Sequence, residues 1–170
     1  PSLVGSEMCI RDSYRPDIVG YKTLEESRQE DIINHSFGIS VKEKEKLIKA
    51  RIGQGEYRNK LLEECPYCPF TMVNDERLLI ASHIKPWVKS NDKEKIDPKN
   101  GFIFTPTYDK LFDRGFITFE SDKTLRVSPW LSPMNQKRLG IYTGMLIKKL
   151  NLDDRREKYL KYHRENIFKS

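Results

Sequence analysis

The segment 78–115 most constrains what this chain can fold into. Its apolar run LLIASHI predicts a strand that ends before Pro86, and GFIFT predicts a second short strand. Between them lies VKSNDKEKIDPKN, for which we expect a long polar loop. TPTYDKLFDRG then predicts a helix, because Thr105 suits the N-cap, Pro106 the first helical position and Gly115 the C-terminal stop. The resulting order is strand, loop, strand and helix.

The histidine at the end of the first strand, His83, has two interpretations. It is either a core histidine with satisfied ring nitrogens or a positioned general base, and its position alone does not choose between them. The predicted helix carries Asp109 and Asp113, which project from one face one turn apart. Such a pair can hold one hard divalent cation together with waters and a phosphate oxygen. Alternatively, the two carboxylates pair with Lys110 and Arg114.

Helix, strand and loop together predict a concave site, which we call the cup. In this cup a metal ion lies over the helix, the imidazole of His83 faces the metal, and Asn100 lies where the loop returns to the second strand.

Two cysteines, Cys65 and Cys68, form a CxxC pair in ECPYCPFT. Tetrahedral zinc needs four ligands, and the sequence has no second CxxC or nearby Cys/His pair. A redox pair would need a βαβ setting, which is not predicted here. We therefore expect unmetallated thiols that pack a turn, with no disulfide in a reducing compartment.

The segments before the cysteines predict helices. SVKEKEKLIKARI begins with a capping box, because Ser40 is followed three residues later by Glu43. We expect Gly53 and Gly55 to interrupt this helix and EYRNKLLEE to continue as a second one. TLEESRQEDIINH, earlier in the chain, is a weaker helix candidate. After the central segment, FITFES and TLRVS predict a hairpin that turns at 122–123.

The first thirteen residues, PSLVGSEMCIRDS, need separate treatment. Back-translated, most of this segment can be written as a transposase-type sequencing-library adapter. Our hypothesis is that 1–13 is an assembly artefact and that natural sequence enters near Tyr14. Resequencing the locus without that library chemistry would test it.

Composition limits the function classes. The chain has 31 Lys and Arg against 25 Asp and Glu, and its isoelectric point is about 9.2. This balance favours polyanionic partners, although a solvated surface of mixed charge also produces it. No apolar run approaches the roughly 18 residues of a membrane span, and no signal peptide is evident. We therefore expect a cytoplasmic protein without a membrane partner.

Three stretches carry a resemblance to a known family. ASHIKPW, DPKNGFIFTPTYDKLFDRGFITF and YLKYHRENIF resemble the HNH endonuclease family, in its subgroup with an SHIxPW opening. The resemblance implies an α+β fold with a ββα-metal core and flanking N- and C-terminal helices. We divide the chain accordingly into a helical N-terminal arm, a nuclease core and a C-terminal helical extension, at 14–64, 65–131 and 132–170.

The resemblance also implies roles for individual residues. His83 would be the general base, Asn100 would hold the loop beside it, and Asp109 stands where the family has its third motif residue, a metal ligand. One divalent ion would then assist in-line hydrolysis of a phosphodiester. A carboxylate at Asp109 favours Mg²⁺ or Mn²⁺.

The sequence departs from the family pattern at two places. Ser82 stands where many members have an acidic or histidine metal ligand, so either Asp113 and waters complete the site or metal affinity is weak. Thr105 and Tyr108 stand where a second CxxC pair would fall, and we therefore expect no structural zinc.

Basic residues near the predicted site suggest contacts with nucleic acid. Lys and Arg side chains neutralise phosphates and position a duplex without reading its sequence. The candidates are Lys85, Lys89, Lys99 and Arg114.

Three hypotheses for function follow. The first is a metal-dependent DNA endonuclease, of a restriction or other defence type, acting alone, as a homodimer or as a module of a longer chain. The second is an HNH fold that binds DNA without cleaving it. The third is a zinc or redox module built on the CxxC pair.

Overall fold

The computed structural model describes residues 40–170, except for the side chains of residue 44 and of residues 46–52. The hypothesis about 1–13 and the helix expected at 23–35 lie outside the described residues. The chain divides into two compact units, Pro1–Ile52 and Gly53–Ser170. None of the helices described here is long and apolar enough to cross a membrane.

One long helix, α3, spans Val41–Glu64. The predicted capping box is confirmed, since Glu43 N donates to Ser40 Oγ and Ser40 N donates to Glu43 Oε2. The expected interruption at Gly53 and Gly55 is wrong. A glycine inside a helix costs only about 1 kcal/mol relative to alanine, a cost that the burial of the following apolar residues offsets.

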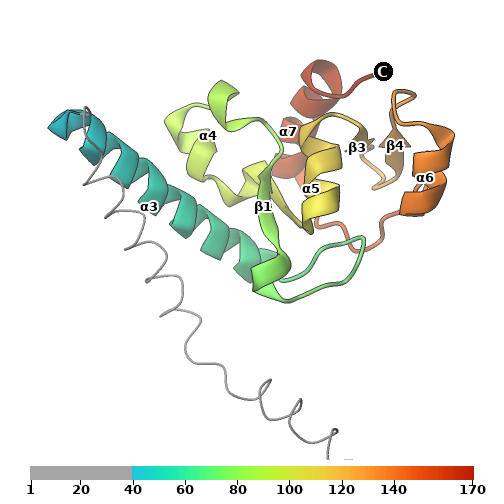
Figure 1. Ribbon diagram of the computed structural model, residues 1–170, viewed down its shortest axis with the longest axis horizontal. Coiled ribbons are helices and arrows are strands. Elements are labelled where there is room, and N and C mark those ends of the chain that lie inside the picture. Colours follow the sequence, from blue (N-terminus) through green and yellow to red (C-terminus); the bar gives the residue numbers. More distant parts are fainter. Residues whose placement is uncertain (1–39) are drawn as a thin grey trace, which may run out of the picture. The chain divides into compact units, whose positions relative to one another are not determined.

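The predicted strand, strand and helix are confirmed (Figure 1). Strand β1, Ile80–His83, pairs antiparallel with β2, Gly101–Phe104, and α5, Pro106–Asp113, packs on this ribbon. Gly115 adopts a φ of 71°, which ends α5 as expected. Strand β1 is shorter than the apolar run, because the turn η1 occupies Glu76–Leu78.

The segment between β1 and β2 is not the long loop that we expected. It holds two short 3₁₀ turns, η2 at Trp87–Lys89 and η3 at Pro98–Asn100, and a short helix, α4, at Asp92–Ile96. A complete capping box between Asn91 and Glu94 begins α4. The spacing of these two residues was the sequence signal for this helix.

The C-terminal part of the chain contacts α5 through β3, Ile117–Phe119, and η3 through α7, Asp154–Asn166. The predicted hairpin is confirmed as β3, which pairs antiparallel with β4, Leu125–Val127. Helices α6, Pro133–Leu139, and α7 follow. Aromatic rings from β2, α5 and β3 contact one another in the core with mostly tilted or edge-on geometry. These rings belong to Phe102, Phe104, Phe112 and Phe119.

A buried arginine fastens α7 to the rest of the domain. Arg156 is 0% exposed, and its guanidinium lies 2.6 Å from Glu64 and 2.8 Å from Asp153. It also donates to the backbone oxygens of Gly101 and Pro98. The end of α3, the start of β2 and the start of α7 therefore meet at one charged group.

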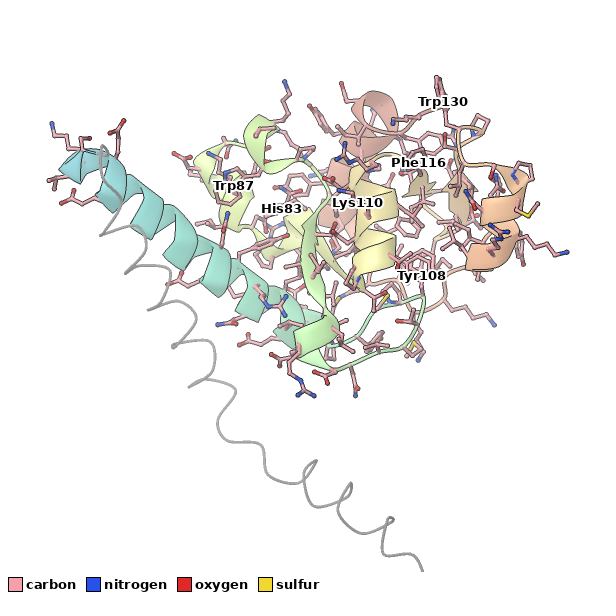
Figure 2. The ribbon with its side chains drawn as sticks, in the orientation of Figure 1. His83, Trp87, Tyr108, Lys110, Phe116 and Trp130 are labelled. Carbon is pink, nitrogen blue, oxygen red and sulfur yellow. The ribbon has the colours of Figure 1, made fainter. Side chains whose placement is uncertain are left out.

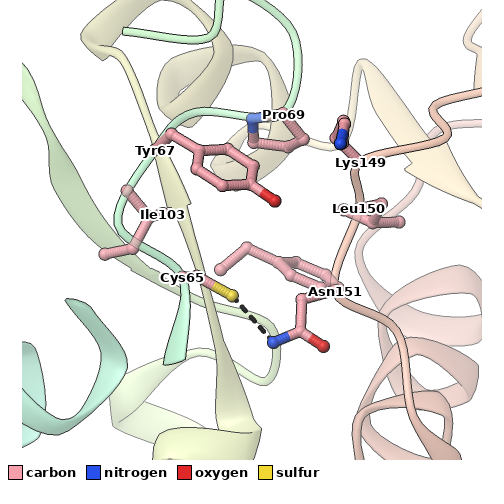
Figure 3. Close-up of a pocket in the computed structure, with 8 residues that line it drawn as sticks. Cys65, Tyr67, Pro69, Ile103, Lys149, Leu150 and Asn151 are labelled. Carbon is pink, nitrogen blue, oxygen red and sulfur yellow. Dashed lines mark hydrogen bonds between the residues drawn. The ribbon is translucent and has the colours of Figure 1, made fainter. Parts of the chain in front are cut away.

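The two cysteines are buried, free thiols. Cys65 Sγ accepts a hydrogen bond from Asn151 Nδ2 at 3.0 Å, beside a cavity of about 10 Å³ (Figure 3). Cys68 Sγ lies 3.6 Å from Thr105 Oγ1. Burial raises the pKa of the Cys65 thiol. A cavity of this size holds about one water molecule.

A buried histidine predicts acid sensitivity of the fold. His163 hydrogen-bonds Thr118 and the Phe112 carbonyl, and its burial lowers its pKa to about 4. The folded state therefore favours the neutral ring, so this stabilisation is complete above pH 6.5 and is lost as the pH falls toward 4. We expect a loss of about 3 kcal/mol from this group over that interval.

Urea unfolding at several pH values between 7 and 4 measures this loss. A His163→Gln variant is expected to be less stable at pH 7 and to show a shallower decline over the same interval. An equally steep decline in the variant would contradict the assignment.

Candidate active site

The two faces of β1 carry different candidate residues. Successive side chains of a strand point to opposite faces. Ser82 is buried beside Asp109 of α5, whereas Ala81 and His83 line a hollow on the other face. Figure 2 shows His83 and Trp87 on the α3 side of β1 and Lys110 on α5. The expected cup, with the imidazole facing α5, is therefore not what the structure has.

The hollow beside His83 has a volume of about 350 Å³. Its described lining combines aromatic rings, an amide and one guanidinium. The residues are Gln54, Tyr57, Arg58, Ala81, His83 and Trp87. The first three come from α3, so residues far apart in the sequence build this part of the site.

The ring of His83 is held on three sides. It stacks on Tyr57 with centroids 4.2 Å apart, meets Trp87 edge-on at 5.6 Å, and places Nε2 3.0 Å from the Lys95 carbonyl oxygen. A carbonyl only accepts, so Nε2 carries the proton of the neutral ring and Nδ1 holds the free lone pair. No described residue hydrogen-bonds Nδ1, which is not a buried atom.

The environment also favours the neutral form of His83. Burial lowers the pKa of His83, and the hydrogen bond to the Lys95 carbonyl partly opposes this effect. A neutral imidazole with a fixed ring plane and an accessible lone pair can take a proton from water.

Asn100 organises the chain that supplies the Lys95 carbonyl. Its side chain is fully buried; Oδ1 accepts from Lys85 N at 2.8 Å, and Nδ2 donates to Glu94 O at 3.1 Å. Nδ2 also lies 3.3 Å from Ser90 Oγ. One amide thus ties the start of this segment to α4, whose Lys95 carbonyl contacts His83.

Replacing Asn100 with alanine is expected to destabilise the fold by about 3 kcal/mol, because it leaves buried backbone groups without partners. Urea unfolding measures the loss. Ser90→Ala is the matched control, since it removes one hydroxyl from the same cluster and is expected to cost about 1 kcal/mol. Equal stability of the Asn100→Ala variant and the wild type would contradict this role.

Tyr57 connects Asn100 to His83. Its hydroxyl donates to the Asn100 carbonyl at 3.0 Å while its ring carries the stack on His83. A Cβ at position 101 would lie 1.9 Å from this hydroxyl, so Gly101 leaves the space that Tyr57 needs. Gly101 pairs with His83 across the ribbon, which places the ring against the end of β1.

The carboxylates of α5 form a separate, oxygen-rich group. Burial raises the pKa of Asp109; the Ser82 hydrogen bond opposes this shift and the Asp113 charge adds to it. Asp113 is 62% exposed and lies 4.0 Å from the Arg114 guanidinium. A partly buried carboxylate that is repelled by a second one fits a hard divalent cation.

This donor set is small. Within residues 40–170 no group of three or more His, Cys, Asp or Glu side chains is placed to hold a metal ion. Ser82, Asp109 and Asp113 would hold a cation only together with waters or substrate oxygens.

Two of the predicted nucleic-acid contacts are already paired with carboxylates. Lys85 Nζ lies 2.7 Å from Glu94, and Lys99 Nζ lies 2.9 Å from Glu64 and 3.1 Å from Asp153. These ammonium groups support the fold around Asn100 and Arg156. The phosphate contacts of Lys85 and Lys99 stay predictions.

The other two predicted contacts are open to solvent. Lys89 lies exposed in η2, and the Arg114 side chain at the end of α5 is 61% exposed. Both remain candidates for phosphate contacts.

Sequence reasoning missed the α3 side of the site. Tyr57 and Arg58 stood in a predicted helix whose basic residues could meet phosphate but were expected mainly to form a solvated face, and the Lys95 contact uses a backbone atom that no side-chain pattern reveals. The one sequence signal for these residues was the adjacent aromatic and basic pair in EYRNK, a combination that occurs in nucleic-acid-binding surfaces.

Comparison with known proteins agrees with the resemblance seen in the sequence. Residues 68–120 match the model of a family described as HNH endonuclease. A search of the curated proteins found no match. The matched segment contains β1, β2 and α5, with His83, Asn100 and Asp109, and it excludes the α3 residues of the hollow. Residues 68–120 of this chain are therefore similar to the HNH endonuclease family.

Proposed function

We propose that this chain is a metal-dependent DNA endonuclease in which His83 is the general base. One observation carries the proposal: the Nε2–H group of His83, which lines the hollow, donates to the Lys95 carbonyl, and this leaves the Nδ1 lone pair without a described hydrogen-bond partner. HNH domains are nuclease or DNA-binding domains, and a fixed, neutral imidazole is what a nuclease needs to activate water.

The reaction follows from the residues of the hollow. Nδ1 of His83 takes a proton from a water molecule, and the oxygen of that water attacks the phosphorus of a DNA phosphodiester. The Lys95 carbonyl stabilises the imidazolium that forms, because it still accepts the Nε2 proton. Tyr57 and Trp87 fix the ring plane, so the imidazole is already oriented for proton transfer before each reaction.

The carboxylates of α5 are the proposed metal ligands. Asp109 and Asp113 would hold one divalent ion, with Ser82 as an additional oxygen. Because these carboxylates lie on the face of β1 opposite the hollow, an ion bound there would polarise the phosphate and stabilise the leaving 3′ oxygen only if the DNA backbone passes the end of β1 at His83. We propose Mg²⁺ or Mn²⁺, because all three donors are hard oxygen atoms.

A silent DNA-binding module is the alternative function. Two observations favour it: Ser82 stands beside the base where an acidic ligand would strengthen the site, and the described carboxylates form no three-membered cluster. Under this alternative the basic surface would still bind DNA.

Binding and cleavage on the same labelled duplex separate the two functions. The full chain is incubated with DNA in EDTA, Mg²⁺ or Mn²⁺, and bound and cut DNA are resolved on native and denaturing gels. Cleavage in Mg²⁺ or Mn²⁺ and none in EDTA is the expected result. Binding without cleavage in either metal would establish the silent module instead.

Substituting the metal ligands gives a further prediction. Asp109→Asn is expected to raise the Mn²⁺ concentration for half-maximal cleavage at least about tenfold, because it removes one of two charged ligands. In EDTA the same variant is expected to resist urea better than the wild type, since the repulsion with Asp113 is lost. Lys110→Gln is the control for a charge change on α5. Unchanged metal dependence in Asp109→Asn would rule out this ligand.

A further inference from the structure

The hollow beside His83 carries a positive charge that the mechanism above does not use. Arg58 lines this hollow, and no carboxylate is among the described residues of the lining. The side chain is half-buried; burial lowers its pKa, and the Glu76 carboxylate partly opposes this shift. An arginine nevertheless stays protonated in proteins. The hollow therefore presents a permanent cation next to the base.

Backbone carbonyls hold the guanidinium of Arg58 in place. Nη1 donates to Leu79 O at 2.8 Å and Nη2 donates to Glu76 O at 2.6 Å. Both acceptors are backbone carbonyls, and the Glu76 carboxylate acts on the Arg58 charge only electrostatically, by raising its pKa. A guanidinium has five N–H donors. Two of them fix its orientation, and the others remain for a ligand.

Other arginines of the domain differ in this respect. Arg156 and Arg164 form close ion pairs with glutamates, and Arg155 pairs with Asp97. Arg58 combines fixed geometry and partial burial with hydrogen bonds to backbone carbonyls, which are the properties of an anion site rather than of a hydrogen-bonded structural ion pair.

We propose that Arg58 binds a non-bridging oxygen of the phosphate that His83 attacks. This proposal rests on the proposed function, and it names the part of the substrate that the hollow recognises. Leu79 and Glu76 carbonyls hold the guanidinium at the edge of the hollow that Ala81 and His83 line, so a phosphate on Arg58 lies beside the base. Arg58 would position the phosphate and balance the charge that builds up on it during attack.

Phosphate binding tests the site without requiring cleavage. The full chain in EDTA is titrated with inorganic phosphate while ¹⁵N NMR follows the amides of Ala81 and His83 and the indole of Trp87. Saturable shifts at these groups are expected in the wild type, with at least about tenfold weaker affinity in Arg58→Gln. Arg58→Lys keeps the positive charge but loses the planar set of guanidinium donors, and its phosphate affinity is expected to lie between those of the wild type and Arg58→Gln. Arg138→Gln, on exposed α6, is the matched control and should bind as the wild type does.

Measuring DNA cleavage by the same variants separates this inference from the proposed function on which it rests. At saturating DNA and metal, the single-turnover rate of Arg58→Gln is expected to fall about tenfold to a hundredfold. Phosphate binding by a wild type that never cuts DNA would overturn the nuclease and leave the anion site. Cleavage by a wild type whose hollow shows no phosphate shifts, or an Arg58→Gln variant that binds and cuts normally, would overturn the role of Arg58. If Arg58→Gln unfolds at lower urea than the wild type, the phosphate affinity of Arg58→Lys is measured instead. A purely structural role of Arg58 predicts that a folded Arg58→Lys protein binds phosphate as the wild type does, whereas the proposed role predicts weaker binding.

Discussion

Replacing His83 with alanine is expected to lower the single-turnover rate of DNA cleavage by about 10²–10⁴-fold. The variant loses the Nδ1 lone pair that takes the proton from water, while the carboxylates of α5 lie on the other face of β1 and keep their metal. Metal affinity and DNA affinity should therefore stay within about threefold of the wild type. Rapid mixing of a labelled duplex with excess protein and Mn²⁺ measures the rate.

Trp87→Phe is the matched control for the His83 result. It changes an aromatic neighbour of the imidazole without removing the base, and the smaller ring can keep an edge contact. We expect a loss of less than tenfold in this variant. A His83→Ala protein that is folded, binds DNA and still cuts within threefold of the wild-type rate would contradict the assignment of the base.

The second large effect concerns stability. Arg156→Met is expected to lower the free energy of unfolding by about 3–5 kcal/mol, because removing one partner of a buried ion pair leaves the others uncompensated. The carboxylates of Glu64 and Asp153 would lose their buried partner, and the carbonyl of Gly101 would lose a donor. Urea unfolding at pH 7 measures the difference.

A neighbouring arginine provides the comparison for Arg156. Arg155 is 64% exposed and pairs with Asp97 at 2.9 Å. Exposed pairs contribute at most about 1 kcal/mol, so Arg155→Met should cost much less than Arg156→Met. Equal losses in the two variants would show that α7 is not held by the buried network.

Local signals predicted much of the fold. The N-cap, proline and glycine of α5, the capping box at Ser40 and the hairpin each depend on residues that are neighbours in sequence, and the structure has all of them. The same held for the order of β1, β2 and α5, since apolar runs and turn residues mark each element. The HNH family match then agrees with the ββα arrangement.

Side-chain partners that are distant in sequence were not predictable in the same way. The face of β1 on which His83 lies depends on Tyr57 of α3, and the ion pairs of Lys99 depend on Glu64 and Asp153. A charge pattern shows that lysines are present but not which carboxylates neutralise them. For the same reason the sequence pointed to Lys99, whose ion pairs it does not reveal, and not to Arg58, whose guanidinium donates to backbone carbonyls beside the hollow.

Restoring the missing imidazole tests the central claim most directly. In a His83→Gly variant the hollow of about 350 Å³ gains further space beside Tyr57 and Trp87, and free imidazole can enter it. We predict that this variant does not cut supercoiled plasmid in Mn²⁺, and that added imidazole restores cleavage in a dose-dependent manner. Cleavage by His83→Gly at the wild-type rate without imidazole would contradict the account.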